Sequence, residues 1–193
     1  TKTKLELRPI LQASGNGASE LVSNVTASVV GMLYNFQLLR LAGQNGVAAF
    51  GVLMYVEFIF AAVFIGYAIG CAPIVSYHFG AGNRGELQNL LRKSILLMGV
   101  GGLAMVGVAQ GLAEPMARLF VGYDDTLCQM TVHAFRIATL SFVLVGFNIF
   151  ASSFFTALND GVVSAIISFL RTFVFKLSAV LLLPLIWELD GIW

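Results

Sequence analysis

Five long apolar segments dominate this sequence and constrain its fold more than any other feature. A helix needs roughly 20 apolar residues to cross a bilayer, whereas a barrel strand needs only about ten. Lipid offers backbone groups no water to bind, so only helices and closed barrels span it. The sequence therefore predicts an all-α, polytopic membrane helix bundle with five transmembrane helices. The segments occupy residues 18–41, 47–77, 94–120, 128–157 and 162–187.

The composition favours a membrane location and excludes several function classes. Only 11 Lys+Arg and 10 Asp+Glu occur among 193 residues, and 58% are apolar, whereas a soluble domain carries about a quarter charged residues. A net charge of +1 leaves no basic stripe for phosphates, so we expect membrane lipid and no nucleic acid as a partner. Cys71 and Cys128 are isolated and predict neither a disulfide framework nor a metal site. We expect no cofactor.

Short connections and basic residues predict how the segments are oriented. Residues 42–46 (AGQNG) are typical of a hairpin turn, and the amphipathic part of 78–93 is expected to lie along the membrane surface. Basic residues mark the cytoplasmic side of membrane proteins, which places the N-terminal arm and 78–93 in the cytoplasm. One side receives Lys2, Lys4, Arg8, Arg84, Arg92 and Lys93, and the other receives Arg40 and Arg118.

A polar stripe runs along the first apolar segment. On a helix Glu20, Asn24, Ser28 and Asn35 fall within an arc of about 80°. One interpretation is a packing face, where polar groups bond across to another helix. The other is the lining of a transport pathway in which the Glu20 carboxylate binds a proton or cation, because an ionisable residue in a membrane helix indicates function by default.

Weaker stripes occur on the fourth and fifth segments. Asn148 and Ser152 share an arc with Ser141, Thr156 and Asn159, and Ser164 and Ser168 share a face with Arg171 and Ser178. Lys176 lies about 140° from Arg171 on an α-helical wheel. These stripes must face protein or water.

Three charges lie at similar depths within different segments. Glu57, Arg136 and Lys176 are each about eight to eleven residues from the same predicted membrane surface, at about 1.5 Å per residue. We therefore predict an intramembrane charge pair between Glu57 and either Lys176 or Arg136, because an unpaired buried charge is costly. The alternative is that each basic side chain extends separately to a membrane interface or a cavity.

Five stretches resemble the multidrug and toxic compound extrusion (MATE) transporters. They are SELVSNVTASVVGMLYN (19–35), NGVAAFGV (45–52), FIGYAIGCAPIVSYHFGAGN (64–83), FNIFASSFFTALNDG (147–161) and SAIISFLRT (164–172). The resemblance is nearest to the bacterial branch of the family. It implies twelve spans in two lobes, of which this chain resembles the seventh to eleventh. Residues 1–17 would then be a cytoplasmic amphipathic arm linking the lobes, and 18–193 an incomplete C-lobe bundle without its final helix.

The same resemblance implies a multi-pass protein of the bacterial cytoplasmic membrane that exports organic, often cationic, compounds by H⁺ or Na⁺ antiport. Its partners would be drug-like substrates and an N-terminal lobe of the same polypeptide. Glu20 resembles a coupling acid of the seventh span, and Asn24, Ser28, Asn35, Asn148 and Ser152 would line the cavity. Some members carry an Asp in the tenth span where this sequence offers only Asn148, so both coupling ions stay open.

Three alternatives remain at the level of sequence. A lipid-linked oligosaccharide flippase would gather Arg136, Arg171 and Lys176 in one cationic cavity. An intramembrane enzyme would need a nucleophile and a base within hydrogen-bond reach, for which Ser76 and His78 are the only faint option, so we expect no enzyme. A non-transporting membrane scaffold would seal the polar stripes in packing.

Overall fold

The computed structural model describes the backbone of residues 7–193 and the side chains from residue 24 onward. Every regular element in this part of the chain is helical, as the sequence predicts. Four stretches are long and apolar enough to cross a membrane: Asn24–Gly80, Arg84–Val121, Asp125–Ala157 and Gly161–Trp187. The elements are α1 (Leu7–Gly80), α2 (Arg84–Val121), α3 (Asp125–Ala138), η1 (Thr139–Ser141), α4 (Phe142–Ala157), α5 (Gly161–Phe169), η2 (Leu170–Lys176), α6 (Leu177–Leu182) and α7 (Pro184–Trp187).

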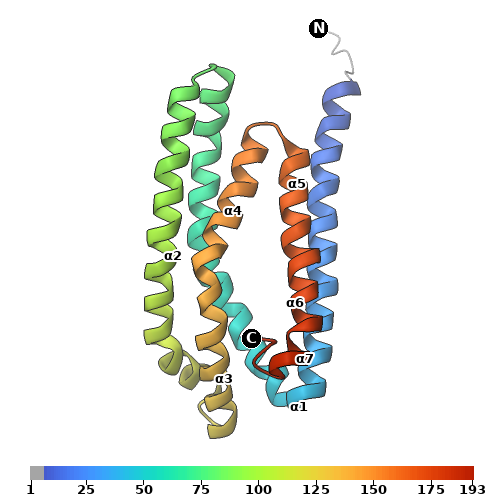
Figure 1. Ribbon diagram of the computed structural model, residues 1–193, viewed down its shortest axis with the longest axis vertical. Coiled ribbons are helices and arrows are strands. Elements are labelled where there is room, and N and C mark those ends of the chain that lie inside the picture. The colour runs from blue at the N-terminus through green and yellow to red at the C-terminus, as the bar shows by residue number, and fades with distance from the viewer. Residues whose placement is uncertain (1–6) are drawn as a thin grey trace.

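Helix α1 reverses direction at Gly43 and so forms two legs (Figure 1). Gly43 has φ 64° and ψ −151°, a conformation that glycine adopts without steric cost. Tyr34 on the first leg stacks on Phe50 on the second, with ring centroids 5.1 Å apart. The same residues would be about 24 Å apart along a straight helix. The turn expected at 42–46 therefore contains the break in α1.

Side-chain caps begin the helices that follow the turns. Asn83 precedes α2, Asp124 precedes α3 and Asp160 precedes α5. Each carbonyl or carboxylate oxygen accepts a backbone N–H two or three residues later, at 2.9–3.2 Å. Such caps satisfy N–H groups that a helix leaves unpaired at its start.

The expectation that the amphipathic stretch within 78–93 lies along the membrane surface is wrong. Residues 84–93 are the first turns of α2, which runs unbroken to Val121. Three leucines form the apolar side of this stretch: Leu87, Leu90 and Leu91. They pack against a core cluster that includes Phe64 and Met98. At 38 residues, α2 is about 57 Å long, so it extends beyond a hydrocarbon core of roughly 30 Å.

Small residues on α2 let its neighbours approach closely. Ala109, Ala113 and Ala117 recur every fourth position and are fully buried. Such spacing brings membrane helices together because no bulky side chain separates their backbones. The surrounding cluster takes side chains from α1, α3 and α4, including Leu53, Val56, Phe135 and Phe142.

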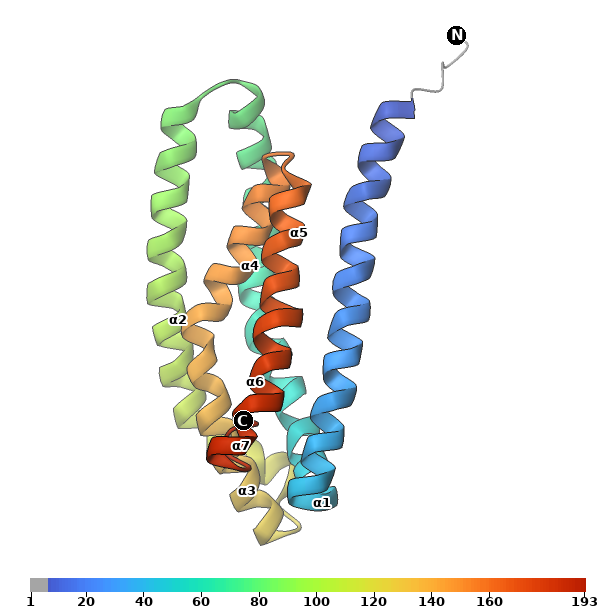
Figure 2. The ribbon, with the colours of Figure 1, turned by 45° about the vertical axis from the view of Figure 1, so that its right-hand side comes forward.

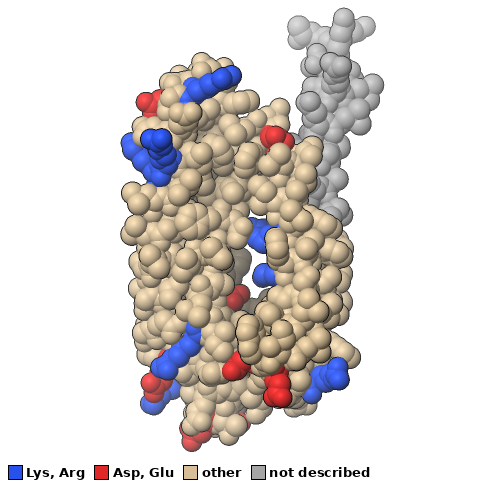
Figure 3. All heavy atoms as spheres, viewed as in Figure 1, with Lys and Arg blue, Asp and Glu red and all other residues tan. Residues whose placement is uncertain are grey.

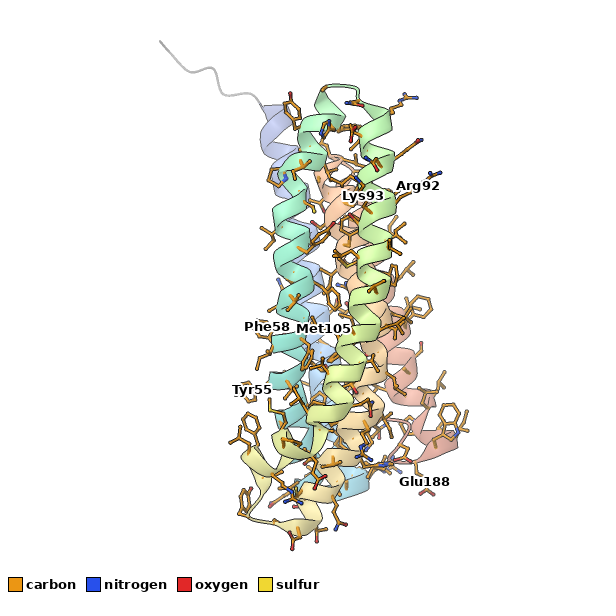
Figure 4. All side chains as sticks on the ribbon, turned by 90° about the vertical axis from the view of Figure 1, so that its left-hand side faces the viewer. Tyr55, Phe58, Arg92, Lys93, Met105 and Glu188 are labelled. Carbon is orange, nitrogen blue, oxygen red and sulfur yellow. The ribbon has the colours of Figure 1, made fainter. Side chains whose placement is uncertain are left out.

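The connections gather at two opposite ends of the bundle (Figures 1 and 2). At one end the α1–α2 loop lies beside the α4–α5 turn, where Ser76 Oγ donates to the Ala157 carbonyl at 2.9 Å. At the other, His133 Nε2 is 2.8 Å from Asp190 Oδ1 near the C-terminus. Arg92 and Lys93 lie toward the first end (Figure 4). Residues 84–93, which begin α2, are therefore at the opposite end of the bundle from Arg118 near the end of α2 and Arg40 beside the Gly43 reversal.

Replacement of Gly102 tests the contact between α2 and α4. A Cβ there would lie 2.9 Å from the Phe142 carbonyl oxygen and 3.1 Å from the Val143 Cα, so backbone must shift. We expect Gly102→Ala to destabilise the protein by about 1–3 kcal/mol, measured by thermal unfolding in detergent. Gly107→Ala is the matched control, since nothing lies within 4 Å of its Cβ. Equal melting temperatures for the two variants would contradict the close packing.

Candidate functional site within the membrane helices

Glu57 on α1 and Lys176 on η2 belong to helical segments that pack against each other. Glu57 lies partly buried on the second leg of α1, and its charge interacts with Lys176 at the end of η2. Tyr34, on the first leg, also lies within the field of Glu57. Among the described residues, Glu57 and Lys176 make no direct hydrogen bond or ion pair. The pairing of Glu57 with Lys176 or Arg136 stays a prediction.

A hollow opens midway along the face that Figure 3 shows. Basic and acidic atoms lie within it, well away from the charges at the two ends of the molecule. The surface between the hollow and the ends is uncharged on this face. Charged groups at such depth are expensive in lipid unless they meet protein or water, so this hollow is a candidate functional site.

Helix η2 is a π-helix, and this changes the expected positions of its two cations. Its hydrogen bonds join residues five apart, so Arg171 and Lys176 lie about one turn apart and on similar sides. The separation of about 140° expected on an α-helical wheel is therefore wrong. π-helical segments are rare and occur frequently at functional sites.

Arg136 lies at a bend in the adjoining element. It is exposed in the last turn of α3, directly before η1. Gln110 Nε2 of α2 donates to the Arg136 carbonyl at 2.8 Å and to Thr139 Oγ1 at 3.0 Å. These bonds fix the backbone at the point where the α-helix becomes a 3₁₀-helix.

The polar stripe of the first leg is exposed where the structure describes it. Ser28 Oγ donates to the Asn24 carbonyl at 3.0 Å, and Asn35 Nδ2 donates to the Gly31 carbonyl at 2.9 Å. Asn148 on α4 bonds in the same way to Leu144, at 3.2 Å. The side chain of Glu20 lies outside the described residues, so its role stays a prediction.

Asn35 also lines a separate open pocket of about 570 Å³ near the Gly43 reversal. The other lining residues are Phe36, Leu39, Gln44, Val47 and Ala48. Amide and apolar groups therefore share this part of the first leg. Asn24 and Ser28 are exposed on the same leg but do not line this pocket.

Ser152 belongs to a cluster of hydroxyl groups between α4 and α5. Its Oγ is 2.9 Å from Ser164 Oγ and 3.1 Å from Ser168 Oγ, and Thr156 Oγ1 donates to Ser164 Oγ at 2.8 Å. Ser164 and Ser168 are buried. The stripes on these two helices therefore face each other, and Ser152 contributes to helix packing here.

Tyr34 is the residue that the sequence interpretation missed. It lies about 40° from Glu20 on a helical wheel, at the edge of the polar stripe, and that position was its only sign. Ser76, by contrast, donates to Ala157, so its hydroxyl is already engaged away from His78. No group of three or more metal-binding side chains occurs in the described part of the chain.

These features define a class: a polytopic membrane protein whose helices carry polar and charged side chains between its two ends. The chain belongs to the MatE family, whose family model matches residues 21–181. Proteins of this family are transporters. Among curated proteins there is no match.

A solved structure, "Crystal structure of MATE in complex with MaL6", has the same fold. It superposes with a TM-score of 0.86 at 22% sequence identity and covers 96% of this chain. The chain spans only 42% of that protein's length. The likeness therefore establishes the arrangement of the helices.

The hydroxyl cluster predicts a modest loss of stability on substitution. Ser164→Ala removes bonds to Ser152 and Thr156, and polar contacts between membrane helices contribute roughly 0.6 kcal/mol and at most about 1.7 kcal/mol. We expect a lower unfolding temperature in detergent. Ser178→Ala, at an exposed position in α6, is the control. If the two variants unfold alike, the α4–α5 cluster is not a stabilising contact.

Proposed function

We propose that this chain is one lobe of a cation-coupled exporter of organic, often cationic, compounds in the bacterial cytoplasmic membrane. Membership of the MatE family is the observation that carries the proposal. The 42% coverage of the matched structure supports a second lobe, which would complete the transport pathway. Membrane lipid and drug-like substrates are the proposed partners.

The proposed topology has five crossings, corresponding to the seventh to eleventh of a twelve-span transporter. They are the two legs of α1, then α2, then α3 with α4, and finally α5 to α7. The reversal at Gly43 supports counting α1 twice. The basic residues of 84–93 support a cytoplasmic position for the α1–α2 loop.

The proposed mechanism is competition within an alternating-access cycle. A proton or Na⁺ on Glu20 and an organic cation elsewhere in the cavity favour opposite-facing states, so each biases the same two-state equilibrium. Asn24 is one turn beyond Glu20 and is exposed, as are Ser28 and Asn35. Exposed amides in a membrane helix need protein or water beside them, which supports a pathway along the first leg. Asn148 is proposed to line the cavity from α4, whereas Ser152 is engaged in the α4–α5 hydroxyl cluster.

We predict that Glu20→Gln abolishes export in the full-length protein without lowering its amount in the membrane. The substitution removes the charge that binds the coupling ion but keeps the shape of the side chain. Drug susceptibility of cells, measured at several Na⁺ concentrations and pH values, is the test. Glu114→Gln is the control because Glu114 is exposed and, within the described part of the chain, pairs only with Arg118, at 2.6 Å. Resistance retained by Glu20→Gln would remove Glu20 from the mechanism.

A second candidate, a lipid-linked oligosaccharide flippase, is favoured by one observation. Arg171 and Lys176 lie on similar sides of η2, and paired cations suit a pyrophosphate group. Arg136 occupies a different element, α3.

Neutralisation of Lys176 separates the two candidates. A flippase loses binding of an anionic pyrophosphate lipid in the Lys176→Gln variant, by about tenfold for a lost charge-assisted contact. An exporter of cations retains its substrate. Binding of each ligand class to the purified full-length protein is the measurement, and a loss confined to the anionic ligand would establish the second candidate.

A further inference from the structure

An apolar pocket of about 400 Å³ opens between the second leg of α1 and α2. All the residues that line it are apolar, and they include Ile59, Val63, Gly101, Ala104 and Val108. Ile59, Val63 and Val108 are each more than half exposed, so the pocket is open to whatever surrounds this face. Apolar walls offer no hydrogen bond to water or to a polar ligand. The pocket therefore suits an apolar chain.

The pocket lies at the depth of the bilayer midplane. Lys93 and Glu114 bracket residues 94–113, which carry no charge. Twenty residues of continuous helix are about 30 Å long, which matches the thickness of the hydrocarbon core. Figure 4 shows Met105, another lining residue, further along α2 than Lys93, and the two are about 18 Å apart along the helix. One leaflet fills about half of the hydrocarbon core, so a lipid tail that begins beside Lys93 ends at this pocket.

Two cations lie where such a tail begins. Arg92 and Lys93 are exposed, and within the part of the chain that the structure describes neither makes an ion pair or a side-chain hydrogen bond. Arg118, toward the other end of α2, is instead bound to Glu114 at 2.6 Å. Of these two ends of α2, the one with Lys93 therefore has positive charge available for the phosphate of a lipid headgroup.

One side of α2 connects the cations with the pocket. The following residues of α2 fall within an arc of about 80° on a helical wheel: Lys93, Leu97, Gly101, Ala104 and Val108. Beside Lys93, the Tyr67 and Ser94 hydroxyl oxygens are 2.9 Å apart and join α1 to α2. The two helices are thus held together where the headgroup would lie, and the exposed Leu97 continues the apolar path to the pocket.

We propose that an anionic phospholipid binds this face of α1 and α2, in the leaflet on the side of the α1–α2 loop. Its phosphate lies against Arg92 and Lys93, and one acyl chain runs past Leu97 into the pocket beside Met105. A second lobe is a poorer occupant, because it is needed where exposed amides such as Asn35 require protein or water, and no polar residue lines this pocket. The inference goes beyond the proposed function, since it concerns neither the substrate nor the coupling ion.

The headgroup is tested with two lipids that share their tails. Native mass spectrometry measures the binding of dioleoyl-phosphatidylglycerol and of dioleoyl-phosphatidylcholine to the purified full-length protein in a neutral detergent. We expect the anionic lipid to bind at least about fivefold more tightly, since one Lys or Arg contributes about that factor. Lys93→Gln should lower the affinity for phosphatidylglycerol about fivefold and leave that for phosphatidylcholine unchanged.

Arg40→Gln is the matched control for the headgroup, because it removes an exposed cation at the opposite end of the bundle. It should bind both lipids as the unmodified protein does. Equal affinities for the two lipids, or an equal loss in Arg40→Gln and Lys93→Gln, would overturn the proposal.

The tail is tested by filling the pocket. Ala104→Phe should weaken both lipids roughly tenfold, because about two methylene groups lose their burial. Leu103→Phe is the control: Leu103 is exposed at the same depth but lies about 100° from Ala104 on α2, outside the pocket. If Ala104→Phe does not fold, Val108→Phe replaces it. Unchanged lipid affinity in a folded pocket variant would contradict the tail site.

Two other occupants of this face give different results. Glycerol phosphate has the headgroup chemistry without the tails, and we expect it not to displace phosphatidylglycerol. Displacement would indicate a simple anion site and overturn the proposal. A second lobe that covers this face would leave the full-length protein unable to bind phosphatidylglycerol here, so that Lys93→Gln and Ala104→Phe both bind lipid as the unmodified protein does, and this result would also overturn it.

Discussion

The need to satisfy polar groups in a solvent that offers no hydrogen bonds organises this protein. Backbone groups meet that need within helices, and all regular structure in the described chain is helical. Polar side chains meet it in two ways. Ser28, Asn35 and Asn148 bond to carbonyls one turn earlier in their own helix. The hydroxyls of α4 and α5 bond to each other. Among the residues that the structure describes, Glu57 and Lys176 follow neither solution.

The position of that charged site depends on two departures from regular helix. The first is the reversal at Gly43, without which Tyr34 and Glu57 would lie about 35 Å apart along one axis. The second is the π-helix η2, which turns Lys176 toward the side that Arg171 occupies. Each departure changes the direction of a side chain without adding a residue. The position of this site therefore depends on the irregular backbone at Gly43 and in η2, and the regular helices support it.

The apolar segments and turns were predictable because their causes are local. Helix ends near 83, 124 and 160 follow from capping side chains, and the break at Gly43 lies within a segment rich in glycine. The course of residues 84–93 was not predictable, because Leu87 and Leu90 pack against residues distant in sequence. A helix on the membrane surface and the packed end of a long helix have similar amphipathic patterns, so the pattern alone does not distinguish them.

The candidate site was predictable only in part, for the same physical reason. Depth along the helices places Glu57 and Lys176 at one level, and their pairing stays a prediction. A helical wheel assumes α-helical geometry, with about 100° per residue. It gave the wrong position of Lys176 relative to Arg171 because η2 is a π-helix. Nothing in the sequence pairs Tyr34 with Phe50 or Ser152 with Ser164, because those contacts depend on how separate helices pack.

The exposed polar residues of the first leg require protein or water beside them. An Asp or Lys at the centre of a membrane helix costs roughly 2.5–3.5 kcal/mol on insertion, and exposed Asn24 and Asn35 add to that cost. Lipid against these groups would therefore work against insertion, whereas water or another lobe would not. The faces that carry them are then the faces turned away from lipid. Such a face is also where a water-borne cation first meets an acidic side chain, so the same residues that make insertion costly make transport possible.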